Sequence, residues 1–286
     1  MKNTMKGVIV LLLITLSLNI NGQENLVYNG SFEEYWYCPP PISRDSFPCK
    51  YWHSTPFFSI ADYFNSCSQD TFFSVPCNDR GCYLPKSGNA YIGIIVIGKE
   101  TGGMEYIQGT FKEPLIKGQK YKISFWVRLA YQYSDYAIYN IGAYISKYNI
   151  FSPILDLDND YCHLLDPTLK AQITNKPNNF IIDTGWVEIS GIYRAQGGER
   201  FITIGCFWDD TPEIVKAYNK VKINQSYTNS YIKKFEKVVE KYMLMKNELM
   251  LEKYENWPSK ISDFDGKKKN YAYYLIDDVS VIELDE

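Results

Sequence analysis

The sequence has few of the residues and motifs on which most enzyme chemistry depends. Only two histidines occur, His53 and His163, and neither lies in a metal-ligand spacing or a triad-like setting. GxSxG, HExxH and Gly-rich phosphate-binding loops are absent. Carboxylate pairs for glycoside hydrolysis are not excluded, because folding can bring together any two of the 33 acidic residues. The sequence therefore favours a non-catalytic protein, with a hydrolase as the less favoured alternative.

The sequence also lacks an excess of charge of one sign and, after its start, any long apolar run. The 30 basic and 33 acidic residues leave a formal net charge of −3, whereas nucleic-acid binding needs a clear excess of Lys and Arg. Beyond residue 22 no stretch is long and apolar enough to span a bilayer. We expect no nucleic-acid partner and no transmembrane segment in the mature chain.

Residues 1–22 have the layout of a secretory signal peptide. Lys2 and Lys6 precede an apolar run over 8–18, which is too short to span a bilayer, and small polar residues follow it. A short membrane anchor is the alternative. We expect an exported protein, secreted or at the outer cell surface, with a single domain over 23–286.

Cysteines are concentrated in one segment, 35–86, which is also rich in Pro and has little regular pattern. Disulfides are expected in an exported chain, and they stabilise such a loop-rich segment most. Cys77 and Cys82 are close enough in sequence to close a small local loop. The total of seven cysteines leaves at least one unpaired within the chain. Zinc is disfavoured, because no CxxC pair occurs.

From residue 89 onward, short runs rich in Val, Ile, Tyr and Phe follow one another, separated by Gly, Asn or Pro. Nothing alternates between strand and helix patterns in the way that βα units do. The sequence therefore predicts an all-β protein with an antiparallel β-sandwich. Including a first run with an Asn-Gly turn inside it, the predicted strands lie at 25–33, 90–97, 105–111, 120–130, 140–146, 186–195, 200–208 and 273–284.

Alternation within the predicted strands assigns side chains to faces. In 120–130 the core side is formed by the odd-numbered residues from Tyr121 to Leu129, so Trp126 and Arg128 point the other way. A Trp ring and an Arg fork on one face can stack on a sugar and donate hydrogen bonds to it. The alternative is that a loop, a helix or a second layer covers this face. By the same logic Tyr144 points outward.

Residues 229–254 break the β pattern. They are rich in Lys, Glu, Leu and Met, contain no Gly or Pro, and place apolar residues near helical spacing. We predict a helical insertion over 212–260. It either packs on the sandwich, which we favour, or projects to bind a surface protein.

Acidic residues occur near both ends of the mature chain. NGSFE ends in Glu33, and YLIDDVSV contains Asp277 and Asp278. If the two terminal segments lie side by side, these carboxylates repel one another unless a cation joins them, and Ca²⁺ accepts six to eight oxygen ligands. Alternatively, the three side chains cap turns or face solvent.

These two terminal motifs, together with SGNAY at 87–91, resemble carbohydrate-binding modules with a galactose-binding-like jelly roll, notably the xylan- and glucan-binding families. The chain is also similar to domains in exported surface proteins of gliding-type Gram-negative bacteria. That second similarity covers most of 25–284 but not 212–260. The sequences that carry it are DYFNSC, EYIQ, EPL…GQKY…SFWV, AIYNIGAY, ISGIYRAQGGERFITIG and IDDVSV.

The resemblance implies a structural Ca²⁺ held by Glu33, by groups from Lys86 to Gly88, and by Asp277 or Asp278. It also implies a disulfide between Cys38 and Cys67. In the resembling domains the sugar site lies on the concave sheet or at the loop tips. Here the candidate sugar-contacting residues are therefore Trp126, Arg128, Tyr144 and Phe207.

The function expected from these observations is a secreted or cell-surface, non-catalytic module that binds a glycan or cell-surface polysaccharide. The alternative is a structural or adhesion protein that binds another surface protein through the inserted helix.

Overall fold

The computed structural model describes residues 23–39, 47–55, 61–98, 104–150, 169–182, 185–207, 221–222 and 271–285. Every regular element in these ranges is a β-strand, and every named pairing is antiparallel. Across these ranges, no helix is long and apolar enough to cross a membrane. The expected signal peptide at 1–22 and the expected helix at 229–254 lie outside the described residues.

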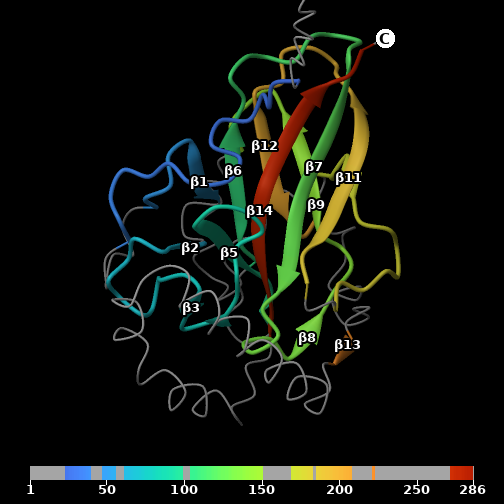
Figure 1. Cartoon of the computed structure of the whole chain (residues 1–286). Helices are drawn as coiled ribbons and strands as arrows, with labels where there is room; N and C mark the ends of the chain where they lie inside the picture. The colour runs from blue at the N-terminus through green and yellow to red at the C-terminus, as the bar shows by residue number, and fades with distance from the viewer. Residues whose placement is uncertain are drawn as a thin grey trace, which may run out of the picture.

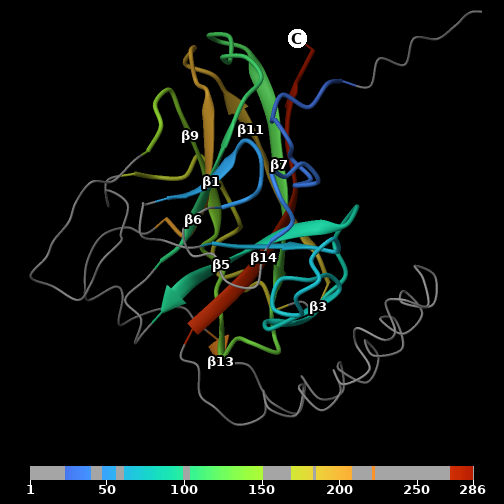
Figure 2. The ribbon, with the colours of Figure 1, turned by 90° about the vertical axis from the view of Figure 1, so that its left-hand side faces the viewer.

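Two five-stranded sheets pack face to face as a sandwich (Figures 1 and 2). Sheet A has the order β1 (Trp52–Thr55), β6 (Tyr106–Thr110), β12 (Phe201–Gly205), β9 (Gly142–Ser146) and β10 (Ile173–Thr174). Sheet B has the order β11 (Val187–Arg194), β7 (Lys120–Leu129), β14 (Tyr271–Glu283), β5 (Ala90–Gly98) and β2 (Asp62–Asn65). Two small pairs remain: β13 (Val221–Lys222) with β8 (Tyr136–Ala137), and β3 (Cys77–Asn78) with β4 (Gly81–Cys82).

The antiparallel sandwich predicted from the alternation is confirmed. All seven runs from residue 90 onward form strands of the two sheets. In β7 the predicted core side chains, from Tyr121 to Leu129 in steps of two, are at most 1% exposed. Apolar residues of the facing sheet, such as Ile107 and Ile204, are fully buried as well. Period-2 patterning was a sufficient signal here, because one face of each strand had to enter the core.

Two predictions about the first third of the chain are wrong in part. Residues 25–33 do not form a strand but a turn with one isolated bridge, Val27 to Phe111. The backbone cannot stay extended there, since Asn29 and Phe32 have φ values of 50° and 60°. The segment 35–86, expected to be irregular, contains four short strands, β1 to β4, and β1 and β2 close one edge of each sheet.

The two ends of the described chain lie side by side. The Leu26 amide donates to the Val281 carbonyl (2.9 Å), and the Val279 amide donates to the Gly30 carbonyl (2.8 Å). A Cβ atom on Gly30 would lie 2.1 Å from the Val279 oxygen, so only glycine permits this approach. In both views the blue N-terminal segment accompanies the red strand β14 (Figures 1 and 2).

Sheet B is covered on its outer face as well. From Ala272 to Asp277, every side chain of β14 is fully buried, on both faces of the strand. Part of the cover is the β3–β4 hairpin, whose Arg80 bonds to Asp62 of β2 at 2.9 Å. The covering layer that the sequence left open as an alternative is therefore present over part of this sheet.

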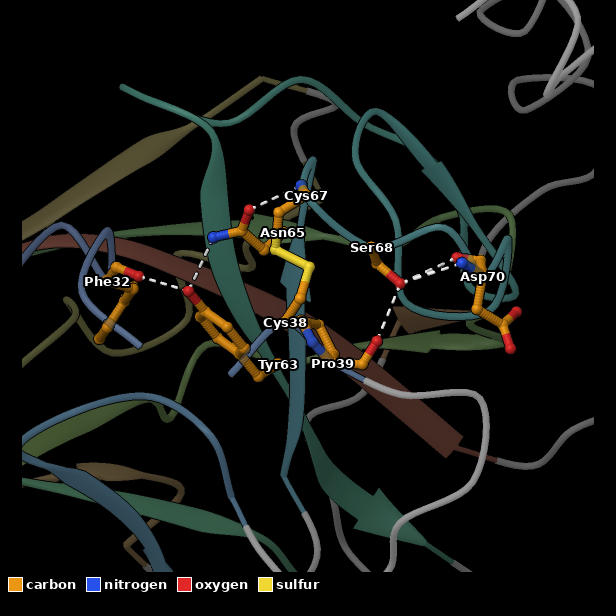
Figure 3. The surroundings of a disulfide bond; sticks show 8 residues. All are labelled: Phe32, Cys38, Pro39, Tyr63, Asn65, Cys67, Ser68 and Asp70. Atoms are coloured by element: carbon orange, nitrogen blue, oxygen red, sulfur yellow. Dashed lines mark hydrogen bonds between the residues drawn. A yellow bond between two sulfur atoms is a disulfide. The ribbon is translucent and has the colours of Figure 1, made fainter. Parts of the chain in front are cut away.

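The structure contains disulfides between Cys38 and Cys67 (Figure 3) and between Cys77 and Cys82. Among the described cysteines, Cys49 and Cys206 are not disulfide-bonded, and both are buried. Burial raises the pKa of each of these two thiols well above its ordinary value. Both therefore stay protonated and act as small apolar core residues.

The range 212–260, predicted as a helical insertion, is described at only two positions. These two residues form β13, which pairs with β8.

Candidate functional site

The segment 86–90 is held by carboxylates from both ends of the chain. Glu33, which follows the N-terminal turn, accepts hydrogen bonds from the amides of Asn89 (2.8 Å) and Ala90 (3.1 Å) through Oε1. Oδ2 of Asp277, in β14, accepts from the amides of Lys86 (2.8 Å) and Ser87 (3.3 Å). The segment thus links two parts of the chain that are far apart in sequence.

Asp278 and Gly88 complete this arrangement. Asp278 Oδ1 accepts a hydrogen bond from the Ser87 hydroxyl at 2.6 Å. Gly88 has a φ of 60°, and a Cβ atom at this position would lie 2.2 Å from Glu33 Oε1. Only glycine allows the Glu33 carboxylate to approach the turn so closely. The residues expected as metal ligands are therefore gathered around one turn.

The Asp277 carboxyl is buried next to the charge of Asp278. Its side chain has no exposed surface. Burial, and then the neighbouring charge of Asp278, raise its pKa to about 8. None of the ion pairs within the described ranges involves Glu33, Asp277 or Asp278. At neutral pH this carboxyl therefore holds a proton unless a cation stabilises its charge.

The chemistry of these groups fits a hard cation. The side chains supply oxygen ligands, which Ca²⁺ prefers. One of them, the Asp277 carboxyl, is buried and forms no ion pair within the described ranges. In the described part of the chain, however, no three His, Cys, Asp or Glu side chains are clustered closely enough to hold a metal ion. A cation at this turn would therefore take at most two carboxylates and complete its shell with backbone carbonyls and water.

Trp126 and Arg128 lie on the outer face of sheet B. The Lys86 ammonium lies 4.3 Å from the centroid of the Trp126 ring, which is half-buried. Arg128 is only 5% exposed, and its guanidinium lies 5.3 Å from the centroid of the Tyr83 ring. The role of Arg128 as a sugar ligand stays a prediction, but in this structure its guanidinium packs against the Tyr83 ring, directly after β4.

Tyr144 and Phe207 lie together on sheet A, which is the other layer. Their ring centroids are 6.0 Å apart, and Phe207 lies 5.4 Å from the Tyr106 ring. The Tyr106 ring fits because residue 205 is glycine, where a Cβ atom would lie 2.2 Å from the ring. The structure thus places the predicted sugar-contacting residues in two pairs on different sheets. They do not form one platform.

Sequence reasoning missed a row of polar side chains beside Tyr144. His53 in β1 lies opposite Gln108 in β6, Gln108 lies opposite Thr203 in β12, and Thr203 lies opposite Tyr144 in β9. Directly paired residues in neighbouring strands share a face, so these four residues, here called the polar row, cross the outer face of sheet A. The sequence does contain one signal for this row: Gln108 and Thr203 are polar residues that each stand between apolar neighbours in their strands.

Gln108 is the buried centre of the polar row. Its Nε2 donates to the Thr203 hydroxyl at 2.8 Å. Its Oε1 is buried, and within the described ranges no donor meets it in full hydrogen-bond geometry, although the His53 imidazole interacts with the Gln108 side chain. Burial lowers the pKa of His53, against the opposing effect of the nearby Asn149 and Gln108 side chains. Gln108 and Thr203 have no exposed surface, whereas His53 and Tyr144 are half-buried. The row therefore presents a neutral imidazole at one end and a phenol next to an aromatic pair at the other.

Comparisons with known proteins give little beyond the architecture. No protein-family model matches the sequence, and no curated protein matches it. Among solved structures, the chain is similar to the CBM22-1 xylan-binding domain of Xyn10C from Paenibacillus barcinonensis. The identity is 10% and the TM-score 0.35, over 82% of this chain and 86% of that one.

The chain is also similar to adhesin domains of Lys-gingipain. For the K1 domain from Porphyromonas gingivalis W83 the identity is 11% and the TM-score 0.33, covering 85% of this chain and 95% of that one. For the K2 domain the identity is 9% and the TM-score 0.34, covering 91% and 98%. Likenesses at TM-scores this low carry no argument. The proposals below rest on the residues of this chain.

Proposed function

We propose that this protein is an exported, non-catalytic module that binds a carbohydrate on the outer face of sheet A. The observation that carries the proposal is the polar row, whose half-buried ends are His53 and Tyr144, with the Phe207 ring beside Tyr144. A pyranose has hydroxyl donors around its rim and an apolar C–H face. The polar row and the ring pair match these two features.

The accessible ends of the polar row carry the argument. Gln108 and Thr203 have no exposed surface, so the sugar would contact the half-buried His53 and Tyr144. The neutral His53 imidazole can donate one hydrogen bond and accept another. Tyr144 is half-buried, so its ring keeps an accessible edge for contact with a sugar.

The test is affinity electrophoresis of the full chain in gels that contain xylan, β-glucan or another soluble polysaccharide. Tyr144→Ala should weaken binding about tenfold, as expected for the loss of one aromatic contact. The matched control is Trp126→Ala on the other sheet, which should leave binding unchanged. Loss of binding in Trp126→Ala with full binding in Tyr144→Ala would move the site to sheet B and contradict this proposal.

A structural Ca²⁺ is the second part of the proposal. Glu33 and either Asp277 or Asp278 would hold the ion, together with carbonyls from the Lys86–Gly88 turn. Bound there, the ion supplies positive charge, with no role in a reaction. Support comes from the gathered carboxylates, from the glycine cradle and from the buried Asp277 carboxyl, which forms no ion pair within the described ranges.

A further inference from the structure

A second group of exposed aromatic residues flanks these sites in the chain: one part follows Glu33 directly, and the other precedes β1, which contains His53 of the polar row. Trp36 is 71% exposed, Tyr51 is 44% exposed and Tyr37 is 38% exposed. They come from two short segments, 34–37 and 48–51, here called the aromatic hairpin. Large apolar side chains at the surface are unfavourable in water, so a group of them indicates a contact surface.

The backbone beneath these rings is braced. The Trp36 amide donates to the Pro48 carbonyl, and the Lys50 amide donates to the Glu34 carbonyl, each at 2.9 Å. The Asn29 side chain ties both segments together: it donates to the carbonyls of Glu34 (2.8 Å) and Lys50 (3.0 Å) and accepts from the Glu34 amide (2.9 Å). The hairpin therefore has little freedom to fold its rings back onto the protein.

A disulfide fixes the same segment at its far side. Cys38 follows Tyr37 directly and is bonded to Cys67, just beyond β2 (Figure 3). The Ser68 hydroxyl donates to the Pro39 carbonyl at 3.0 Å, and the Tyr63 hydroxyl donates to the Phe32 carbonyl at 2.7 Å (Figure 3). Both flanks of the hairpin's first segment are thus attached to the end of β2. Rings held in this way lose little conformational entropy on binding a ligand.

Two of the exposed rings contact a neighbouring side chain through one ring face. Tyr51 stacks on Tyr28, with ring centroids 4.5 Å apart and an interplanar angle of 15°. The Lys50 ammonium lies 4.9 Å from the Trp36 ring centroid. The exposed large apolar residues of the hairpin are all aromatic, whereas the exposed Ile116, Ile182 and Ile192 lie on other elements. The hairpin therefore offers flat ring faces next to an ammonium donor.

We propose that the aromatic hairpin is a second saccharide-contacting platform, separate from the polar row. The proposal shares its ligand class with the proposed function and rests on it in that respect. A stable protein–protein interface buries about 800 Å² on each partner, which needs roughly 20–30 residues a side. Three exposed aromatic side chains are too few for that, but a sugar chain needs only one ring face per pyranose, with donors to its hydroxyls.

Two platforms on one chain also predict a length effect. A polysaccharide that reaches both platforms gains from the high effective concentration of the second contact, whereas a short oligosaccharide contacts only one of them. Binding of the polysaccharide should therefore be tighter than binding of a short oligosaccharide cut from it.

The test uses the full chain, with the polysaccharide to which the wild type binds most tightly as the probe. Trp36→Ala and Tyr51→Ala should each weaken binding about tenfold, while Trp36→Phe should retain most of it. Ile192→Ala is the control, because Ile192 is a 68% exposed apolar side chain on β11 of sheet B, and it should bind as the wild type does. The melting temperature should not change in any of these variants, since the side chains are exposed.

The outcomes separate the two proposals. Wild-type binding in Trp36→Ala and Tyr51→Ala, with loss in Tyr144→Ala, would overturn the hairpin platform and leave the polar row standing. Loss in Trp36→Ala with full binding in Tyr144→Ala would support the hairpin and contradict the polar-row site. Absence of binding to every polysaccharide by the wild type would overturn both.

Discussion

Asp277 shows how a single buried residue can set the pH response of the fold. Its ordinary pKa is 3.8, and in the folded chain burial and Asp278 raise the pKa to about 8. The folded state therefore binds a proton more tightly at this group than the unfolded state does. The stabilising contribution is fully present below pH 3.8 and is lost as the pH rises toward about 8.

We predict that, without calcium, the melting temperature of the wild type falls between pH 5 and about 8 relative to that of Asp277→Asn. The amide cannot ionise, so the variant lacks this part of the pH dependence and serves as the reference. Thermal unfolding followed by circular dichroism across this range measures the difference. Parallel curves for the two proteins would show that Asp277 is ionised in the folded chain and would contradict the account.

At the scale of elements, the β3–β4 hairpin determines how much of the outer face of sheet B is accessible, because it covers part of that face. Arg80 bonds to Asp62 through Nε (3.0 Å) and Nη2 (2.9 Å). Its guanidinium lies 4.3 Å from the Tyr133 ring centroid and 5.2 Å from that of Tyr273. Burial alone would lower the pKa of Arg80, but the combined effect of Asp62 and of the nearby Tyr273, Asp79 and Tyr133 outweighs it. The pKa is therefore raised, and the group stays charged. This cluster attaches the hairpin to β2 and β14.

Arg80→Lys should therefore lower the free energy of unfolding by about 1–3 kcal/mol, because an ammonium cannot keep both hydrogen bonds and the ring stacking. Urea denaturation measures this change. Arg194→Lys is the control: among the described residues Arg194 donates only to the Gly118 carbonyl, in an exposed position, and the change should be near zero. Equal stability of the two variants would show that the cluster does not hold the hairpin.

The long strands were predictable from the sequence, and the short ones were not. β7 and β14 have enough residues for their alternation to be visible, and one face of each had to be apolar. β1 to β4 have two to four residues each, too few for any period to show, and their pairing depends on partners placed by the core.

Alternation did place Trp126 and Arg128 on the outer face. The cover over that face depends on the long-range Arg80–Asp62 pair, which leaves no local pattern.

The polar row was hidden for a related reason. Gln108 and Thr203 stand out as polar residues within apolar strands, and this is a visible signal. That they meet His53 and Tyr144 depends on the register of four strands, which the sequence does not encode in any local pattern. In contrast, the proximity of Glu33 to the 277–278 pair was inferable, because both motifs lie at the ends of a sandwich whose termini are neighbours.

At the scale of the whole molecule, the 86–90 segment connects the beginning and the end of the chain. Glu33 and Asp277 hold it by backbone amides, while Leu26 and Val281 pair alongside. A cation at this turn would bind the native state but not the separated chain ends. Any ligand of that kind stabilises folding by mass action.

Excess chelator should therefore lower the melting temperature of the full chain, and added Ca²⁺ should restore it. Glu33→Gln is the matched variant: it should melt lower in calcium and respond little to the chelator. Differential scanning calorimetry on dialysed protein, with its metal content determined, measures both effects. A melting temperature that is independent of chelator and calcium in the wild type would remove the ion from the account.

The central claim is that the outer face of sheet A binds a sugar through the polar row, and a crystal structure of the full chain with an oligosaccharide tests it most directly. The account predicts an oligosaccharide along the polar row, with one pyranose packed on the Tyr144 ring and a hydroxyl of the chain within about 3 Å of a His53 ring nitrogen. Sugar density confined to the Trp126 face of sheet B, or a polar row that stays unoccupied while the sugar binds elsewhere, would contradict it.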